Sequence, residues 1–138
     1  MSDFFQWDPS KLALNVPDMD REHQVLISYM NELHVLNEQK ASTQAISRAF
    51  DNLVDYTVRH FADEEAYMER IGFPGLRVHK GVHKQLLDKM FGFQRTVRAT
   101  GKLPDDLFVF FKMWLSAHIC GIDVKYANYA HTGKAANG

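Results

Sequence analysis

The sequence contains one cysteine, Cys120, so no disulfide can form within the chain. It also lacks an excess of charge of either sign, because 16 lysines and arginines oppose 17 aspartates and glutamates. The basic residues are scattered, which excludes the concentrated positive surface of a typical nucleic-acid-binding protein. No apolar run approaches the roughly 18 residues of a membrane-spanning helix, and the start of the chain lacks the features of a secretory signal. We therefore expect a soluble cytoplasmic protein that binds neither nucleic acid nor membranes.

The composition and the hydrophobic pattern both indicate a helical globular protein. Apolar residues make up 46% of the 138 residues and charged residues 24%, an ordinary balance for a folded domain. Apolar residues recur at helical spacing in four segments, near residues 18–38, 42–71, 76–99 and 105–130. Between them lie QKAST (39–43), GFPG (72–75) and TGKLP (100–104), which break the pattern.

Four amphipathic helices of about 20 residues with short connections favour an all-α, up-down-up-down antiparallel four-helix bundle. We expect this bundle at residues 19–130, within a single domain of residues 1–138. Residues 1–18 lack a sustained helical period and are expected to form an extended N-terminal arm, whereas residues 131–138 are expected to form a loose tail. Asp18, Ser42 and either Asp105 or Asp106 are candidate N-caps of the first, second and fourth helices.

Polar residues interrupt the apolar stripe of every predicted helix. They are His23 in the first helix, His60 and Glu64 in the second, His79 and His83 in the third, and His118 and Asp123 in the fourth. If the helices alternate in direction, residues at similar distances from a connecting turn lie at similar heights. The distances of these seven residues from the turns agree to within about one helical turn. We therefore expect all seven to meet in one layer of the core.

A single buried histidine is usually a core residue with a hydrogen-bond partner. His34 lies about 16 Å along its helix from His23 and is expected to serve in packing or in a helix-end hydrogen bond. His131 is expected to be solvated, Cys120 to be a small core-facing or interhelical residue and not a nucleophile, and Tyr126 to pack in preference to forming a hydrogen bond near the site. The seven layer residues need another explanation, because each unpartnered buried polar group costs about 1–3 kcal/mol. Together they would cancel a total stability of about 5–15 kcal/mol, and a metal centre would satisfy them all.

The number and type of these residues predict two metals. Seven ligands exceed the number that a single zinc site uses, and carboxylates can bridge two metal ions. If Glu64 and Asp123 both bridge, the five histidines divide unequally, and one solvent-derived bridge then leaves one coordination position open for a small ligand. His118 and Asp123 are five residues apart, so either Asp123 reaches sideways or the helix widens locally as a π-bulge. Because histidines outnumber carboxylates, the ligand set stabilises high-valent iron less, so we expect a peroxide-level adduct to form and be released rather than proceed to O–O cleavage.

Four separate elements, His23, HFADE (60–64), HKGVH (79–83) and HICGID (118–123), resemble the hemerythrin family, most closely its single-domain bacterial members, the bacteriohemerythrins. The resemblance implies a non-haem di-iron centre that binds O₂ reversibly, with two iron ions (Fe²⁺ or Fe³⁺) and a solvent-derived oxo or hydroxo bridge. It assigns His79, His83 and His118 to one iron, His23 and His60 to the open iron, and Glu64 and Asp123 to both as bridges. Leu26, Trp114 and Ile119 become candidates for the lining of an oxygen pocket.

Three functions are compatible with such a centre. An oxygen-binding protein without enzymatic turnover, which carries, stores or delivers O₂, is favoured by the histidine-rich ligand set. An O₂ or redox sensor would usually carry an output domain, for which 138 residues leave no room. A di-iron peroxidase or an NO-handling enzyme would need a proton donor beside the open position, and the sequence compels none. We expect a monomeric carrier with O₂ as its ligand and an oxygen-consuming enzyme as a family-level candidate recipient.

Overall fold

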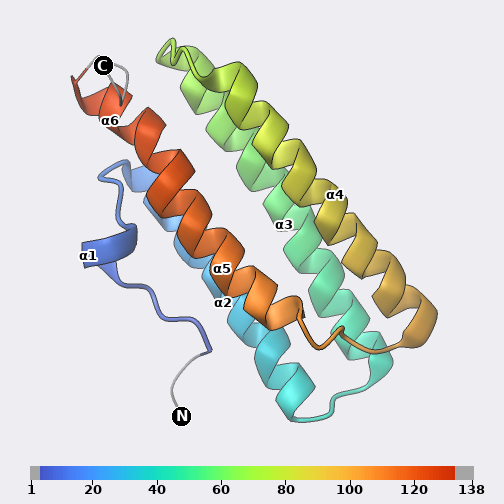
Figure 1. Ribbon diagram of the computed structural model, residues 1–138. Helices are drawn as coiled ribbons and strands as arrows, with labels where there is room; N and C mark the ends of the chain where they lie inside the picture. Colours follow the sequence, from blue (N-terminus) through green and yellow to red (C-terminus); the bar gives the residue numbers. More distant parts are fainter. Residues whose placement is uncertain (1–3, 133–138) are drawn as a thin grey trace.

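The computed structural model describes residues 4–132 and contains helices but no strand in that range. The helices are α1 (Pro9–Leu12), α2 (Pro17–Glu38), α3 (Thr43–Arg70), α4 (Leu76–Thr100), α5 (Leu107–His118), the π-helix η1 (Ile119–Asp123) and α6 (Val124–Thr132). Helices α5, η1 and α6 follow one another without a break and form one helical segment (Figure 1). The predicted all-α four-helix bundle is therefore confirmed, with the fourth helix divided by a π turn.

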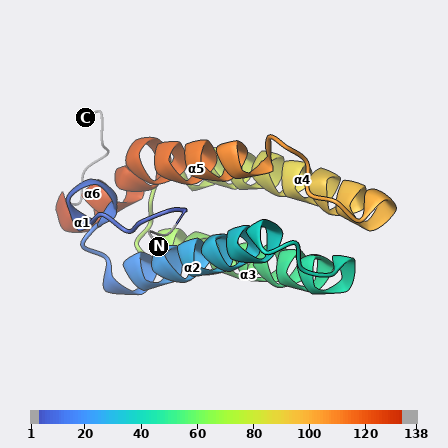
Figure 2. The ribbon, with the colours of Figure 1, turned by 90° about the horizontal axis from the view of Figure 1, so that it is seen from below.

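The four long segments pack in two layers. Figure 2 shows α2 beside α3 in one layer and α4 beside α5 in the other, with the chain reversing direction at each connection. Close contacts join α2 to α3 and α3 to α4. The space between the layers is filled by large buried side chains such as Leu26, Met30, Phe50, Phe61 and Phe111. Every long segment thus has one face on a common core.

The predicted helix caps are confirmed only in part. Asp106 occupies the N-cap position of α5, as predicted, but its side chain makes no capping hydrogen bond. The Ser42 hydroxyl accepts a hydrogen bond from the backbone N–H of Ala45 at 3.1 Å, which confirms the predicted cap of α3. Helix α2 instead begins at Pro17, after Val16, so the prediction that Asp18 caps it is wrong. Proline is favoured at this first position because its missing N–H would have no helical partner there. Asp18 lies within the first turn, where a carboxylate still interacts favourably with the helix dipole.

Gly101 ends α4 in a left-handed conformation, with φ of +72°. We expect Gly101→Ala to lower the free energy of unfolding by about 1–2 kcal/mol, because an L side chain is strained at this φ. A Cβ there would also lie 3.0 Å from Cγ2 of Thr43. Urea unfolding of the variant measures the loss.

Gly92→Ala is the matched control for Gly101→Ala. Gly92 lies inside α4, and a Cβ there would meet only Nη2 of Arg95, at an ordinary 3.8 Å. Alanine should raise the free energy of unfolding by about 0.5–1 kcal/mol at this position, because it has the higher helix propensity. Equal effects of the two substitutions would contradict a conformational role for Gly101.

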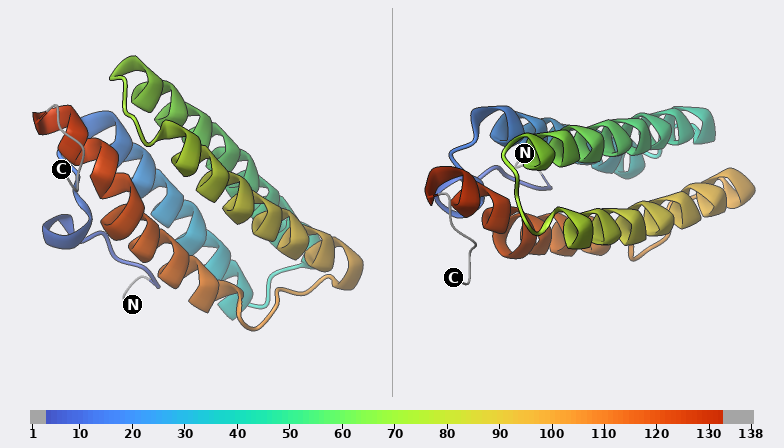
Figure 3. Two further views of the ribbon diagram at one scale, coloured as in Figure 1. Left: turned by 45° about the horizontal axis from the view of Figure 1, so that its top comes forward. Right: turned by 90° about the horizontal axis from the view of Figure 1, so that it is seen from above.

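The N-terminal arm differs from the predicted extended chain because it contains the short helix α1, whose first N–H groups are capped by Asp8. The backbone of Phe5 exchanges two hydrogen bonds of 2.8 Å with the side-chain amide of Asn31 in α2. The carboxylate of Asp20 accepts the backbone N–H groups of Leu14 and Asn15 at 2.8 and 3.1 Å. These bonds attach the arm to the outside of the bundle, where α1 contacts η1 (Figure 3). The predicted loose tail lies mostly outside the described residues.

Within residues 4–132, one segment, Leu107–Thr132, is long and apolar enough to span a membrane by length and composition alone. Charged residues interrupt it, so it contains no continuous apolar run of that length. Its inner face places Phe111, Leu115 and the polar residues His118 and Asp123 in the core of the bundle. We therefore describe it as the fourth helix of the bundle.

Candidate metal centre

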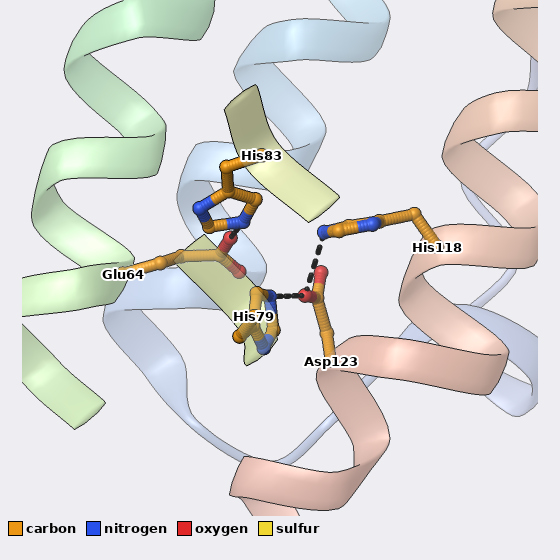
Figure 4. Close-up of side chains that lie close together, drawn as sticks. All are labelled: Glu64, His79, His83, His118 and Asp123. Carbon is orange, nitrogen blue, oxygen red and sulfur yellow. Dashed lines mark ion pairs between the residues drawn. The ribbon is translucent and has the colours of Figure 1, made fainter. Parts of the chain in front are cut away.

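All seven polar residues that interrupt the predicted stripes meet in the middle of the bundle. They are His23 on α2, His60 and Glu64 on α3, His79 and His83 on α4, His118 at the end of α5, and Asp123 at the end of η1. Each has an exposed fraction of 4% or less. We call these residues the cluster; Figure 4 shows five of them, with side chains converging from α3, α4 and the fourth helix.

Asp123 contacts imidazoles from three helices. Its Oδ1 lies 3.0 Å from Nε2 of His79 and 3.0 Å from Nε2 of His118, and its Oδ2 lies 3.1 Å from Nε2 of His23. The two oxygens therefore face different groups of histidines, as the oxygens of a bridging carboxylate must.

Glu64 also contacts imidazoles from three helices, but its Oε1 is shared between histidines of both groups described below. Its Oε1 lies 3.1 Å from Nε2 of His83 and 3.4 Å from Nε2 of His60, and its Oε2 lies 3.3 Å from Nε2 of His23. The cluster divides into two groups of possible ligand atoms, each with its atoms within 4.8 Å of one another, and Glu64 belongs to both. The larger group is Glu64, His79, His83, His118 and Asp123, and the smaller is His23, His60 and Glu64.

The contacts between the imidazoles and the carboxylates of the cluster are close, but they are not hydrogen bonds. Eight buried nitrogen and oxygen atoms of the cluster have no hydrogen-bond partner, among them Nε2 of four histidines and both oxygens of Asp123. In the rest of the described chain only Nε1 of Trp114 shares this state. Each such atom costs about 1–3 kcal/mol, and imidazole nitrogens with carboxylate oxygens are ligands that iron accepts. The residues therefore fit a pair of metal ions.

The π-helix explains how His118 and Asp123 reach the same centre although they are five residues apart. The backbone N–H of Val124 bonds to the carbonyl of Ile119, the i to i−5 pattern that defines a π turn. Of the two alternatives that the spacing left open, the local widening of the helix is the one that the structure contains. Gly121 is not required for it, since a Cβ there would meet nothing within 4 Å.

Comparison with known proteins agrees with this geometry. The family model for the Hemerythrin HHE cation binding domain matches residues 14–130. The chain belongs to the hemerythrin family. It is 32% identical over 117 residues to a bacteriohemerythrin of Stenotrophomonas maltophilia, covering 85% of this chain and 76% of the relative. It is 34% identical over 122 residues to a myohemerythrin of Riftia pachyptila, covering 88% and 90% of the two chains.

The fold is also that of hemerythrin crystal structures. A wild-type hemerythrin superposes with a TM-score of 0.82 at 27% identity, covering 90% of this chain and 95% of the other. The resemblance inferred from four short sequence elements is thereby confirmed over residues 14–130. Members of the hemerythrin family bind a di-iron centre, and the cluster of this chain is suited to one.

Two carboxylates outside the cluster contact its histidines, and the sequence did not predict these contacts. Oε1 of Glu22 lies 2.8 Å from Nδ1 of His60, and Oε2 of Glu65 lies 2.8 Å from Nδ1 of His83. Glu22 and Glu65 directly adjoin the cluster residues His23 and Glu64 in sequence, so they resemble ordinary surface acids one position from a buried residue. The only available signal was this adjacency, which does not identify the histidine that each carboxylate contacts.

Tyr126 was expected to serve mainly in packing, and the structure gives it a second role. It is fully buried, and its hydroxyl donates a 2.6 Å hydrogen bond to Oε2 of Glu64. Burial raises the pKa of Tyr126 well above its usual value, and the nearby carboxylates of Glu64 and Asp123 raise it further. The phenol therefore stays protonated and remains a hydrogen-bond donor.

In the metal-free cluster, positive charge on the histidines balances the negative charge of the buried carboxylates. Burial alone would lower the pKa of His23, but the carboxylates of Asp123 and Glu64 outweigh it and raise the pKa to about 10. Burial alone would raise the pKa of Asp123, but His118, His23 and His79 hold it well below its usual value. The buried carboxylates thus attract positive charge, which protons supply in the metal-free protein and metal cations would supply in their place.

The structure places three other singled-out residues outside the cluster. His34 stacks on Phe4, with ring centroids 4.7 Å apart and an interplanar angle of 12°, which confirms a packing role. His131 is exposed, but its Nε2 lies 3.0 Å from the carbonyl oxygen of Leu14, so it contacts the arm. Of the two positions predicted for Cys120, the core-facing one is wrong and the interhelical one is observed, because its thiol is exposed and donates from η1 to the carbonyl of Lys11 in α1 at 3.3 Å. Cys120 follows the buried His118 by two residues, which places it on the opposite face of the helix.

Proposed function

We propose that this protein binds O₂ reversibly at a di-iron centre and acts as an oxygen carrier without enzymatic turnover. The observation that carries the proposal is the cluster itself: five histidines and two carboxylates, all buried, with eight polar atoms that lack hydrogen-bond partners. A centre with so few anionic ligands stabilises oxidised iron less than a carboxylate-rich one does. It therefore favours release of bound O₂ over its consumption.

The two groups of the cluster support a division of the ligands between two ions. In this proposal His79, His83 and His118 would hold one iron and His23 and His60 the other. Both ions would share Glu64, which belongs to both groups, and Asp123, whose Oδ2 also contacts His23. The second ion would have fewer protein ligands and would therefore be the one that accepts O₂. The iron pair would supply the electrons that O₂ takes up on binding and would regain them on release. All seven proposed ligands come from one chain, so a monomer is sufficient to form the centre. We further propose that this carrier is cytoplasmic and delivers O₂ to an oxygen-consuming enzyme.

Apolar side chains around the cluster support the proposal of a dry oxygen pocket. Leu26 and Ile119 are fully buried and adjoin cluster residues in sequence or one turn away. Trp114 is 6% exposed and packs edge-on against Phe61, with ring centroids 6.1 Å apart. Such a lining excludes water and so protects reduced iron from oxidation. Tyr126, which donates to Glu64, holds that carboxylate in place.

A visible absorption spectrum recorded through one cycle tests the proposed function. The protein is reduced without air, exposed to air, and then stripped of O₂ under vacuum. A charge-transfer band that appears with air and disappears under vacuum, over repeated cycles, is the expected result. A band that decays at once to an oxidised form would overturn the carrier proposal in favour of a sensor or an enzyme. The absence of any band would mean that the metal is not iron.

Replacing one proposed ligand should remove iron and change the spectrum. We expect His83→Ala to lower the iron content from two ions to about one per chain or less and to destabilise the protein, because the metal binds only the folded state. Iron analysis, the visible spectrum and thermal unfolding measure these effects. Full iron and an unchanged spectrum would show that His83 is not a ligand.

His34→Ala is the control for His83→Ala. It removes the same side chain from a partly buried site and loses the ring contacts with Phe4 and Phe108. Each such aromatic contact is worth about 0.5–1.5 kcal/mol, so the variant should be less stable than the wild type. Its iron content and spectrum should nevertheless be unchanged, which separates loss of a ligand from loss of stability.

A further inference from the structure

Two cluster histidines differ from the others in the contact that their Nδ1 atoms make. The rings of His60 and His83 are almost fully buried, yet each Nδ1 faces a carboxylate, of Glu22 and Glu65 respectively, at 2.8 Å. The side chains of Glu22 and Glu65 are 16% and 27% exposed, so they lie between the buried cluster and the solvent. By contrast, Nδ1 of His23 is buried without a hydrogen-bond partner.

These contacts determine which nitrogen of each ring can bind a metal. When Glu22 and Glu65 are ionised they can only accept hydrogen bonds, so Nδ1 of His60 and of His83 then carries the proton. In a neutral imidazole the lone pair then lies on Nε2. The Nε2 atoms of both rings point inward to Oε1 of Glu64, at 3.4 and 3.1 Å. Each outer carboxylate therefore selects the tautomer that presents its ligand atom to the centre.

The two contacts are distributed evenly over the proposed centre. His60 belongs to the smaller group of ligand atoms and His83 to the larger, so each proposed iron has one histidine held by an outer carboxylate. Each contact also joins two helices, because Glu22 reaches from α2 to α3 and Glu65 from α3 to α4. The plane of the His83 ring is fixed further by Phe61, which stacks on it at 3.8 Å with an interplanar angle of 4°.

From these observations we propose that Glu22 and Glu65 are positioning residues of the di-iron centre, which fix the tautomer and orientation of His60 and His83 and strengthen both as iron ligands. The inference rests on the proposed function only in that it requires iron to bind to the cluster. Carboxylates that accept the second N–H of a metal-bound histidine raise its basicity and affect metal affinity by about 10–100-fold. The negative charge that they bring close to the ring also favours oxidised over reduced iron.

The test compares Ala and Gln at both positions in the full-length protein loaded with iron. We measure the rate at which a chelator removes the iron and the reduction potential of the centre. Glu22→Ala and Glu65→Ala should release iron about 10–100 times faster than the wild type and shift the potential in the positive direction. Glu22→Gln and Glu65→Gln keep an acceptor oxygen but lose the charge, so they should shift the potential and slow iron release relative to the Ala variants.

Glu32→Ala and Glu69→Ala are matched controls, because they remove exposed glutamates from the same two helices. They should leave both the release rate and the potential at wild-type values. A purely structural role for Glu22 and Glu65 would lower the melting temperature without moving the potential, and that result would overturn the proposal. Wild-type release rates in the Ala variants would overturn it as well. If the wild-type protein itself binds no iron, the proposed function fails instead, and the two failures are distinguishable.

Discussion

Asp123→Ala is expected to reduce iron binding from two ions per chain to nearly none. Asp123 is fully buried, and its two oxygens are within 3.1 Å of imidazoles on three different helical segments. Its removal takes away a shared ligand of both proposed ions. It also leaves the buried imidazoles without their counter-charge, which costs about 3–5 kcal/mol when one partner of a buried pair is lost. Iron analysis and urea unfolding of the variant measure the two effects.

Asp88→Ala is the control for Asp123→Ala. Asp88 is exposed on α4 and contacts only Nζ of Lys84, at 3.4 Å. An exposed pair with this spacing contributes about 0.3–0.5 kcal/mol, so the control should bind two ions and lose little stability. If Asp123→Ala still bound both ions, Asp123 would not be a bridging ligand, and the counting argument for two metals would fail with it.

Removal of iron from the wild-type protein should lower its melting temperature by on the order of 20 °C. A ligand at 100 times its dissociation constant stabilises the folded state by about 2.7 kcal/mol, and the proposal has two such ions. For a chain of this size each kcal/mol corresponds to about 4 °C. Differential scanning calorimetry before and after treatment with a chelator measures the shift.

The iron-free protein provides the control for the effect of chelation. Adding iron back without air should restore the original melting temperature, and the chelator should not change that of Asp123→Ala. Equal melting temperatures with and without iron would mean that the ions contribute nothing to the folded state. The ions would then not offset the free-energy cost of burying the polar atoms of the cluster that lack hydrogen-bond partners.

The bundle and the cluster were predictable because both depend on periodicity along single helices. An apolar stripe identifies the buried face, and a histidine on that stripe must be buried wherever the helix packs. Counting residues from the turns then places His23 and His118 at one height without knowledge of how the helices contact each other. The family resemblance came from the same residues, and the match over residues 14–130 extends it to most of the chain.

The features that were not predicted depend on contacts between helices. Glu22 and Glu65 lie one position away from buried residues, and the histidine that each one reaches belongs to the next helix. Tyr126 lies on an apolar stripe where packing alone would explain it, and only the arrangement of α3 and α6 brings its hydroxyl to Glu64. The π turn itself depends on how Asp123 packs against the other helices, and the spacing of His118 and Asp123 permitted it but did not require it.

Glu64 is the one residue that both groups of ligand atoms contain, and this sharing bears on how the protein fills with metal. The hydroxyl of Tyr126 holds Oε2 of this carboxylate through a 2.6 Å hydrogen bond, and Glu64 is fully buried. The two proposed ions would therefore share a ligand whose position is set before either ion arrives. A change at Tyr126 would then disturb both ions together, although its hydroxyl lies next to only one of the seven proposed ligands.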